Sequence, residues 1–106
     1  MKLTGKCKTA FKIWFIENIT LKSSEIIYES FILSDFYNLT PSMQYGVYVD
    51  WFDSTGMDIE IAVTPSFREY YCMINDDADD PDLFKTRHEA RTKAISKANE
   101  IYNESN

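Results

Sequence analysis

The sequence predicts a small α+β protein, with helices at both ends and in the centre, combined with a β-hairpin or small antiparallel sheet. Three observations predict this class. The chain has 106 residues, which suits a single domain, 1–106, with a modest core. Apolar residues make up 44% of the chain and recur at helical spacing over most of it. Between residues 59 and 75 this spacing changes to alternation, which indicates strands.

The first predicted helix runs from Thr4, its N-cap, to about Asn18. Apolar residues recur every three to four positions and lysines lie between them, so we expect an amphipathic helix with a basic outer face. The apolar stripe consists of Leu3, Cys7, Ala10, Phe11, Trp14 and Asn18, and the lysines are Lys2, Lys6, Lys8 and Lys12.

Residues 20–39 are ambiguous. Ile27, Phe31 and Ser34 share one face of a helix, but the β-branched and aromatic residues of the segment suit a strand equally well. We favour a short helix here.

The central helix, residues 41–55, has clear ends. Thr40 is an N-cap residue, Pro41 suits the first helical position, and Gly56 suits the left-handed conformation that ends a helix. Gly46 costs about 1 kcal/mol relative to alanine inside a helix, which predicts a close approach by another element. The alternation of apolar residues also allows a strand, but no turn signal interrupts the segment. The predicted stripe consists of Met43, Val47, Tyr48, Trp51 and Phe52.

A β-hairpin follows. Ile59, Ile61 and Val63 alternate with other residues, as in a half-buried strand. A Thr-Pro-Ser turn leads into a second strand, residues 67–75, which is apolar on both faces. We therefore expect this strand to be covered on both sides or to pair at an interface. The aspartate-rich segment 76–82 is predicted to be a solvated loop.

The last helix begins at a capping box formed by Thr86 and Glu89. Its apolar residues are mostly small, so the helix can pack closely on a sheet. They are Ala90, Ala94, Ile95, Ala98, Ile101 and Tyr102. The last few residues are expected to fray.

Charge is distributed unevenly along the chain, whose formal net charge is −6. Residues 1–22 carry five lysines and one acid, residues 23–82 thirteen acids and one arginine, and residues 83–106 five basic residues and three acids. The acidic middle disfavours duplex DNA or RNA as the main ligand. The chain lacks a long apolar run and a signal-peptide pattern, so we expect a cytosolic protein with reduced cysteines and no membrane contact.

Catalytic and metal sites are not predicted. His88 is the one histidine, so a zinc site or a nucleophilic triad would lack a partner for it. Asp77 and Asp79 have calcium-loop spacing, but Asp82 and His88 replace the glycine and glutamate that such a loop requires. We therefore expect a protein that is not an enzyme and needs no cofactor.

The aromatic residues favour binding instead. Seven tyrosines, seven phenylalanines and two tryptophans exceed what a core of this size buries easily. One ligand that fits is a protein surface, steered by the acidic middle. The other is a nucleotide that stacks on an aromatic ring, with Arg68, Arg87 and Arg91 as phosphate contacts. The alternative is that most aromatic residues belong to the core.

Three segments, LTGKCKTAFKIWF, SMQYGVYVDWFDSTGM and FKTRHEARTKAISKANEIYN, resemble a group of small bacteriophage-encoded accessory proteins. They span most of the chain. The FFDSVGI of the group appears here as WFDSTGM, residues 51–57. The shared central segment draws attention to side chains on or beside the helix face opposite the predicted stripe, namely Gln44, Tyr45, Asp50, Asp53 and Ser54.

The resemblance implies a protein that acts in the cytoplasm of an infected bacterium. In general character such proteins are similar to inhibitors of bacterial immunity, including anti-CRISPR proteins. We therefore expect an anti-defence inhibitor that binds a host defence protein or sequesters its nucleotide signal. The alternative is an oligomeric structural or assembly accessory of the phage. The predicted binding residues are Gln44, Tyr45, Asp50, Asp53, Ser54, Arg68, Tyr70, Arg87 and Arg91.

Overall fold

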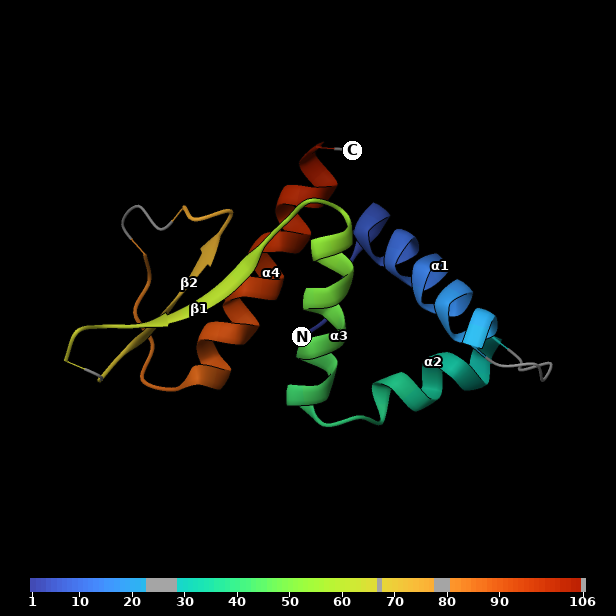
Figure 1. Ribbon diagram of the computed structural model, residues 1–106, viewed down its shortest axis with the longest axis horizontal. Coiled ribbons are helices and arrows are strands. Elements are labelled where there is room, and N and C mark those ends of the chain that lie inside the picture. Colours follow the sequence, from blue (N-terminus) through green and yellow to red (C-terminus); the bar gives the residue numbers. More distant parts are fainter. Residues whose placement is uncertain (23–28, 67, 78–80, 106) are drawn as a thin grey trace.

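The computed structural model describes residues 1–22, 29–66, 68–77 and 81–105, with the backbone alone for residues 19–22 and 29–32. It confirms the α+β class (Figure 1). The helices are α1 (Gly5–Lys22), α2 (Glu29–Tyr37), α3 (Pro41–Ser54) and α4 (Arg87–Ser105), and the strands are β1 (Ile59–Val63) and β2 (Tyr70–Ile74). The helix favoured within residues 20–39 is present as α2, whereas Ile27 lies outside the described residues.

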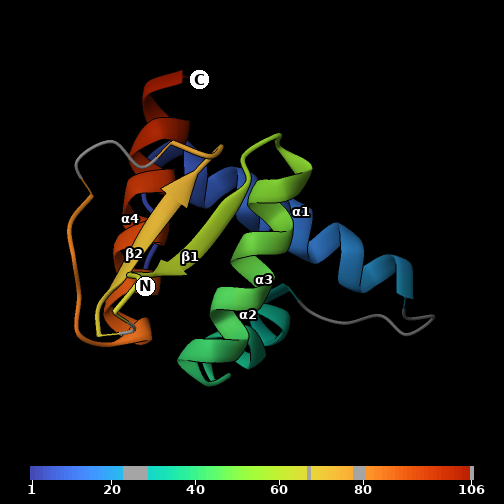
Figure 2. The same cartoon turned by 60° about the vertical axis from the view of Figure 1, so that its left-hand side comes forward.

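Helix α4 is the centre of the fold. It lies against one face of the sheet and also contacts α1 and α3, while α2 packs on α1 (Figures 1 and 2). The predicted stripe of small residues explains this position, because Ala90, Ala94 and Ala98 are fully buried and let neighbouring elements approach closely. Thr86 caps the helix as predicted, since its hydroxyl accepts a hydrogen bond from the Glu89 amide.

The two strands are antiparallel, with Ile59 opposite Ile74 and Val63 opposite Tyr70. This register places Ile59 and Ile74, both buried, on the face that packs against α4. The opposite face carries Ala62, Tyr71 and Met73, which are half-buried. The predicted second strand is therefore confirmed for residues 70–74, while Phe67 lies outside the described residues.

An aromatic core joins the first three helices. The Phe11 ring of α1 lies 5.2 Å from the Phe36 ring of α2 and 4.9 Å from the Tyr48 ring of α3. All three side chains are almost completely buried. Many of the aromatic residues therefore belong to the core. For these residues the alternative prediction, a core role in place of ligand binding, is confirmed.

Two residues assigned to apolar stripes are exposed. Met43 is 58% exposed, because it lies about 140° around the helix from the buried Tyr48, as 3.6 residues per turn require. Ser34 of α2 is also exposed, and Phe36 is the buried residue instead. Both predictions were wrong about the face of the helix that meets the core.

The predicted ends of α3 are confirmed: Thr40 accepts from the Met43 amide, and Gly56 has a φ of 91°.

The close approach predicted at Gly46 is wrong. Gly46 is exposed, and a Cβ built on it would meet no atom within 4 Å. We therefore expect Gly46→Ala to raise the free energy of unfolding by about 1 kcal/mol, through helix propensity alone, in urea denaturation. Gly56→Ala is the matched control and should lower it, because alanine is strained at a φ of 91°. Destabilisation by Gly46→Ala would contradict the open surroundings of this residue.

The two cysteines are free thiols. Burial raises the pKa of the Cys7 thiol to about 12 and also raises the pKa of the Tyr48 hydroxyl. In the unfolded chain these groups lose their protons at lower pH. The free energy of unfolding is therefore expected to be unaffected by them below about pH 9 and to fall as the pH rises from there toward 12. Urea denaturation at pH 8 and pH 11 measures this, and equal stabilities would contradict it.

Candidate functional site

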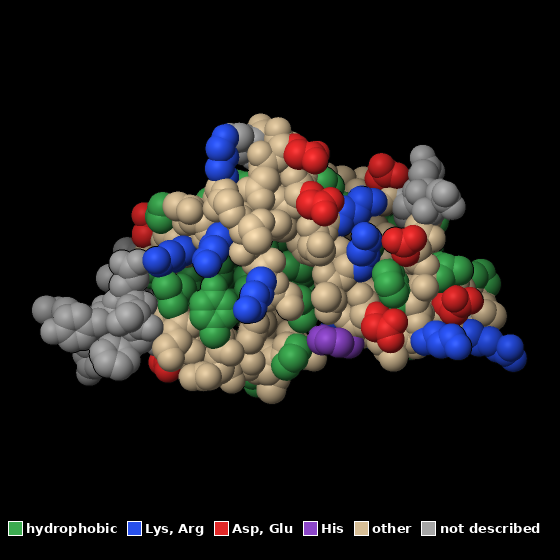
Figure 3. Space-filling view, turned by 180° about the vertical axis from the view of Figure 1, so that it is seen from behind, with side chains coloured by type: hydrophobic (Ala, Val, Ile, Leu, Met, Phe, Trp, Pro, Cys, Tyr) green, Lys and Arg blue, Asp and Glu red, His purple; other side chains and the backbone are tan. Residues whose placement is uncertain are grey.

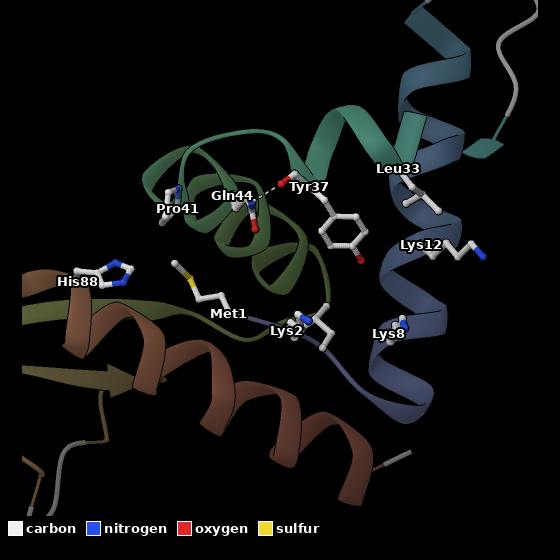
Figure 4. Close-up of a pocket in the computed structure, with 10 residues that line it drawn as sticks. Met1, Lys2, Lys8, Lys12, Leu33, Tyr37, Pro41, Gln44 and His88 are labelled. Atoms are coloured by element: carbon white, nitrogen blue, oxygen red, sulfur yellow. Dashed lines mark hydrogen bonds between the residues drawn. The ribbon is translucent and has the colours of Figure 1, made fainter. Parts of the chain in front are cut away.

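A groove of about 770 Å³ lies between the N-terminal segment, α1, α2 and the first turn of α3, and His88 of α4 also lines it. Figure 4 shows the side chains that line it. Four are basic, one is an amide and the rest are apolar or aromatic. The basic ones are Lys2, Lys8, Lys12 and His88, the amide is Gln44, and the others are Met1, Leu3, Leu33, Tyr37 and Pro41. We call this site the basic groove.

The described lining of the basic groove carries positive charge. No acidic side chain is among its described lining residues, although the whole chain has a net charge of −6. Figure 3 shows basic side chains around an apolar area, with the histidine at its edge. Local positive charge on an acidic protein attracts small anions while the remaining surface repels large polyanions. The arrangement therefore favours a small anionic ligand over a nucleic acid duplex.

Two polar groups face the apolar part of the groove. Tyr37 ends α2, is 47% exposed, and extends its hydroxyl toward the space beside Lys2 and Lys8 (Figure 4). Gln44, in the first turn of α3, donates from Nε2 to the carbonyl oxygens of Tyr37 at 3.2 Å and Leu39 at 3.0 Å. These bonds fix the amide and connect α2 to α3. The groove therefore combines fixed polar groups with a ring on which a flat ligand can stack.

The N-terminal segment forms one wall of the groove and is held by α4. Asn99 accepts from the Thr4 amide at 2.9 Å and donates from Nδ2 to the Thr4 hydroxyl at 3.0 Å. Asn103 accepts from the Cys7 amide at 2.8 Å, which satisfies a free N–H at the start of α1. The helix thus begins directly after Thr4 as predicted, with a hydrogen-bond acceptor supplied by α4.

Asn99→Ala is expected to lower the free energy of unfolding by about 1–3 kcal/mol, because the Thr4 amide and hydroxyl lose their partner in a largely buried position. Urea denaturation measures the loss. The neighbouring exposed Glu100→Ala is the control and should change stability by less than about 0.5 kcal/mol. Equal effects of the two substitutions would contradict the role assigned to Asn99.

Four of the predicted binding residues come together on the sheet side of α4. The Arg87 guanidinium lies 4.9 Å from the centre of the Tyr70 ring, and that of Arg91 lies 5.1 Å from the Tyr45 ring. Arg91 also donates to the Ser42 hydroxyl at 3.2 Å, and its Nε is buried without a hydrogen-bond partner. We call these four the arginine–tyrosine cluster. Each guanidinium covers one face of its tyrosine ring, so a base cannot stack on that face.

Burial raises the pKa of the Tyr45 hydroxyl, and the guanidinium of Arg91 opposes this rise. The neutral tyrosine therefore holds Arg91 through its ring face and not through a phenolate charge. The cluster stabilises the contact of α3 with α4 and keeps both arginines in fixed positions.

The other predicted binding residues lie elsewhere. Asp50 and Asp53 are exposed on α3, and Ser54 donates its hydroxyl proton to the Trp51 carbonyl, which is a helix-end contact. Arg68 is exposed in the β1–β2 connection. The structure brings none of these four into the basic groove, whereas Gln44 does line it.

One group of carboxylates could hold a cation. Oxygens of Asp58, Glu60 and Asp76 lie within 4.8 Å of one another, and all three residues are exposed. Asp79 of the predicted acidic loop lies outside the described residues. Exposed carboxylates cluster often without binding a metal, so this group defines no site by itself.

Five polar lining residues were not among the predicted binding residues: Lys2, Lys8, Lys12, Tyr37 and His88. The lysines were assigned to the basic outer face of the first helix, and His88 was considered only as a catalytic or zinc-binding residue without a partner. His88 is exposed, at the end of the groove formed by the first turns of α3 and α4. The concentration of lysine in residues 1–22 was the one signal that could have indicated this site.

Comparisons of the chain with protein-family models, with curated proteins and with solved structures found no match. Among the described helices, none is both long enough and apolar enough to cross a membrane.

Proposed function

We propose that this chain is a non-enzymatic binding protein that captures a phosphate-bearing ligand of nucleotide size in the basic groove. One observation carries the proposal. A groove of about 770 Å³ is lined by three lysines and a histidine, with no carboxylate among its described lining residues, on a chain with a net charge of −6. Ligand sites of about 300–1,000 Å³ commonly enclose most of a drug-sized molecule.

The lining suits the two parts of a nucleotide. Lysine ammonium groups bind phosphate as mobile point charges, and Lys2 and Lys8 are both exposed at the groove. Leu3, Leu33 and Tyr37 supply apolar and aromatic surface for a base. Binding needs little rearrangement, since Asn99 and Gln44 hold the walls in place.

In the setting that the phage resemblance implies, the ligand is the nucleotide signal of a host defence system, and the protein acts by sequestering it. The proposal thus favours the second of the two modes expected of an anti-defence inhibitor. Binding of a host defence protein remains the other mode, and the fixed arginines of the arginine–tyrosine cluster are the surface that it would use.

Isothermal titration calorimetry with AMP and adenosine tests the proposal. AMP is expected to bind, with an affinity that falls as the salt concentration rises, and adenosine to bind at least about tenfold more weakly because it lacks the phosphate. Absence of AMP binding at low ionic strength, or equal affinity for both compounds, would contradict capture through the lysines.

The second candidate is an oligomeric structural or assembly accessory of the phage. It is favoured by the outer face of the hairpin, where the half-buried Ala62, Tyr71 and Met73 lie together beside the exposed Glu60. Light scattering distinguishes the two functions. A defined oligomer that Tyr71→Lys dissociates would support the accessory role, and a monomer that binds AMP would support nucleotide capture.

A further inference from the structure

We infer that the basic groove selects nucleotides whose base carries an exocyclic amino group, such as adenine or cytosine. The amino group donates to Oε1 of Gln44 and the base stacks on Tyr37. This inference rests on the proposed function and adds the class of ligand. It is carried by the hydrogen bonds of Gln44, the exposure of Tyr37 and the position of the lysines.

The amide of Gln44 is fixed in one orientation. Both of its described side-chain hydrogen bonds run from Nε2 to backbone carbonyl oxygens, those of Tyr37 and Leu39. A carbonyl oxygen can only accept, so the amide nitrogen must face these two atoms. Nε2 donates in both bonds, so Oε1 is the atom that this lining side chain offers to a ligand, and it can only accept.

Figure 4 shows this arrangement: the dashed bond joins the amide nitrogen to the Tyr37 carbonyl, and the amide oxygen turns away from it. Gln44 belongs to the lining of the groove. A ligand that presents an N–H donor here forms a hydrogen bond without moving the amide. A ligand that presents a carbonyl oxygen at the same position places two acceptors together and leaves both unpaired.

Tyr37 supplies the stacking surface beside this acceptor. Its ring meets the Phe36 ring edge-on, at 5.1 Å between centres and 68° between planes, and Phe36 is buried. The contact holds the Tyr37 ring while 47% of the residue stays exposed. Gln44 bonds to the backbone carbonyl of Tyr37 itself, which places the acceptor next to the residue that carries the ring.

The lysines complete the orientation of the ligand. Lys2 and Lys8 belong to the N-terminal segment and α1, whereas Gln44 belongs to α3 on another wall of the groove (Figure 4). A phosphate near the lysines and a base at Gln44 therefore lie at separate ends of one ligand. This separation matches a nucleotide and does not match an inorganic anion, which would use the lysines alone.

Two matched nucleotide pairs test the inference in the wild-type protein by isothermal titration calorimetry. AMP and CMP carry the amino group, whereas IMP and UMP carry a carbonyl oxygen in its place. AMP is expected to bind about tenfold more tightly than IMP, and CMP about tenfold more tightly than UMP, as one unpaired polar contact implies. Equal affinities within each pair overturn the inference and leave phosphate capture intact. Absence of binding by all four overturns the proposed function as well.

Two variants assign the selectivity to its residues. Gln44→Met should bring the AMP to IMP affinity ratio close to one, with circular dichroism confirming that the helices persist. Tyr37→Leu should weaken all four nucleotides, whereas Tyr37→Phe, which keeps the ring, should bind them as the wild type does. A Gln44→Met protein that folds and still prefers AMP tenfold overturns the role of Gln44.

Discussion

Exchange of Lys2 and Lys8 for glutamate should weaken AMP binding by about 100-fold, or about 2.8 kcal/mol. Each substitution replaces an attraction for the phosphate with a repulsion, and two unit charges 4 Å apart interact by about 1 kcal/mol even in bulk water. The fold should persist, because both residues are exposed and a glutamate near the start of α1 suits the helix dipole. Calorimetry with wild-type and variant protein measures the effect.

The control for this pair is Lys85→Glu with Lys97→Glu. Both residues are exposed and neither lines the basic groove, so the net charge changes by the same amount as in the first variant. We expect the control to weaken AMP binding by less than about threefold, through long-range charge alone. Equal losses in the two variants would mean that overall charge, and not the groove, determines binding.

Phe11→Ala should lower the free energy of unfolding by about 3–5 kcal/mol, a large part of the stability of a small domain. Phe11 is 1% exposed, and its ring lies within 5.5 Å of the rings of Phe36, Tyr48 and Trp51. Its removal leaves a cavity where three helices meet. Urea denaturation followed by tryptophan fluorescence measures the loss.

Ile13→Ala is the control for Phe11→Ala. Ile13 lies on the same helix and is 54% exposed, so its truncation should cost less than about 1 kcal/mol. Similar losses at both positions would contradict the placement of Phe11 at the centre of the core.

Local signals predicted the ends of α3 and the start of α4 well, whereas α1 continues to Lys22, past its predicted end near Asn18. Thr40, Pro41 and Gly56 act through their own backbone conformation and hydrogen bonds, which depend little on the rest of the fold. The same holds for Thr86 at the start of α4. Of the alternating residues Ile59, Ile61 and Val63, the first is buried and the other two are half-buried.

The face of a helix that meets the core is a less local property. Val47 and Trp51 were placed on the inner stripe correctly, but Met43 lies about 140° around α3 from the buried Tyr48 and is exposed. Gly46 was interpreted as a contact because glycine is costly in a helix, yet its surroundings are open. Neither outcome depends on nearby sequence, since both follow from where α1 and α4 lie against α3.

The candidate site was predicted less completely than the fold. An exposed lysine has the same sequence pattern on a solvated helix face and at the edge of a groove. Lys2 and Lys8 line a groove because Asn99 and Asn103, more than 90 residues later in the chain, hold the N-terminal segment in place. Gln44 was predicted through the phage resemblance, and the structure gives it a defined set of hydrogen bonds.

The most direct test of nucleotide capture in the basic groove is an NMR titration of ¹⁵N-labelled protein with AMP. Capture in the basic groove predicts that the largest amide shifts fall on Lys8, Tyr37 and Gln44, with little change at Tyr70 and Arg87. Shifts centred on Tyr70 and Arg87 would place the ligand at the arginine–tyrosine cluster and contradict the basic groove as the site. A spectrum unchanged by millimolar AMP would contradict nucleotide capture altogether.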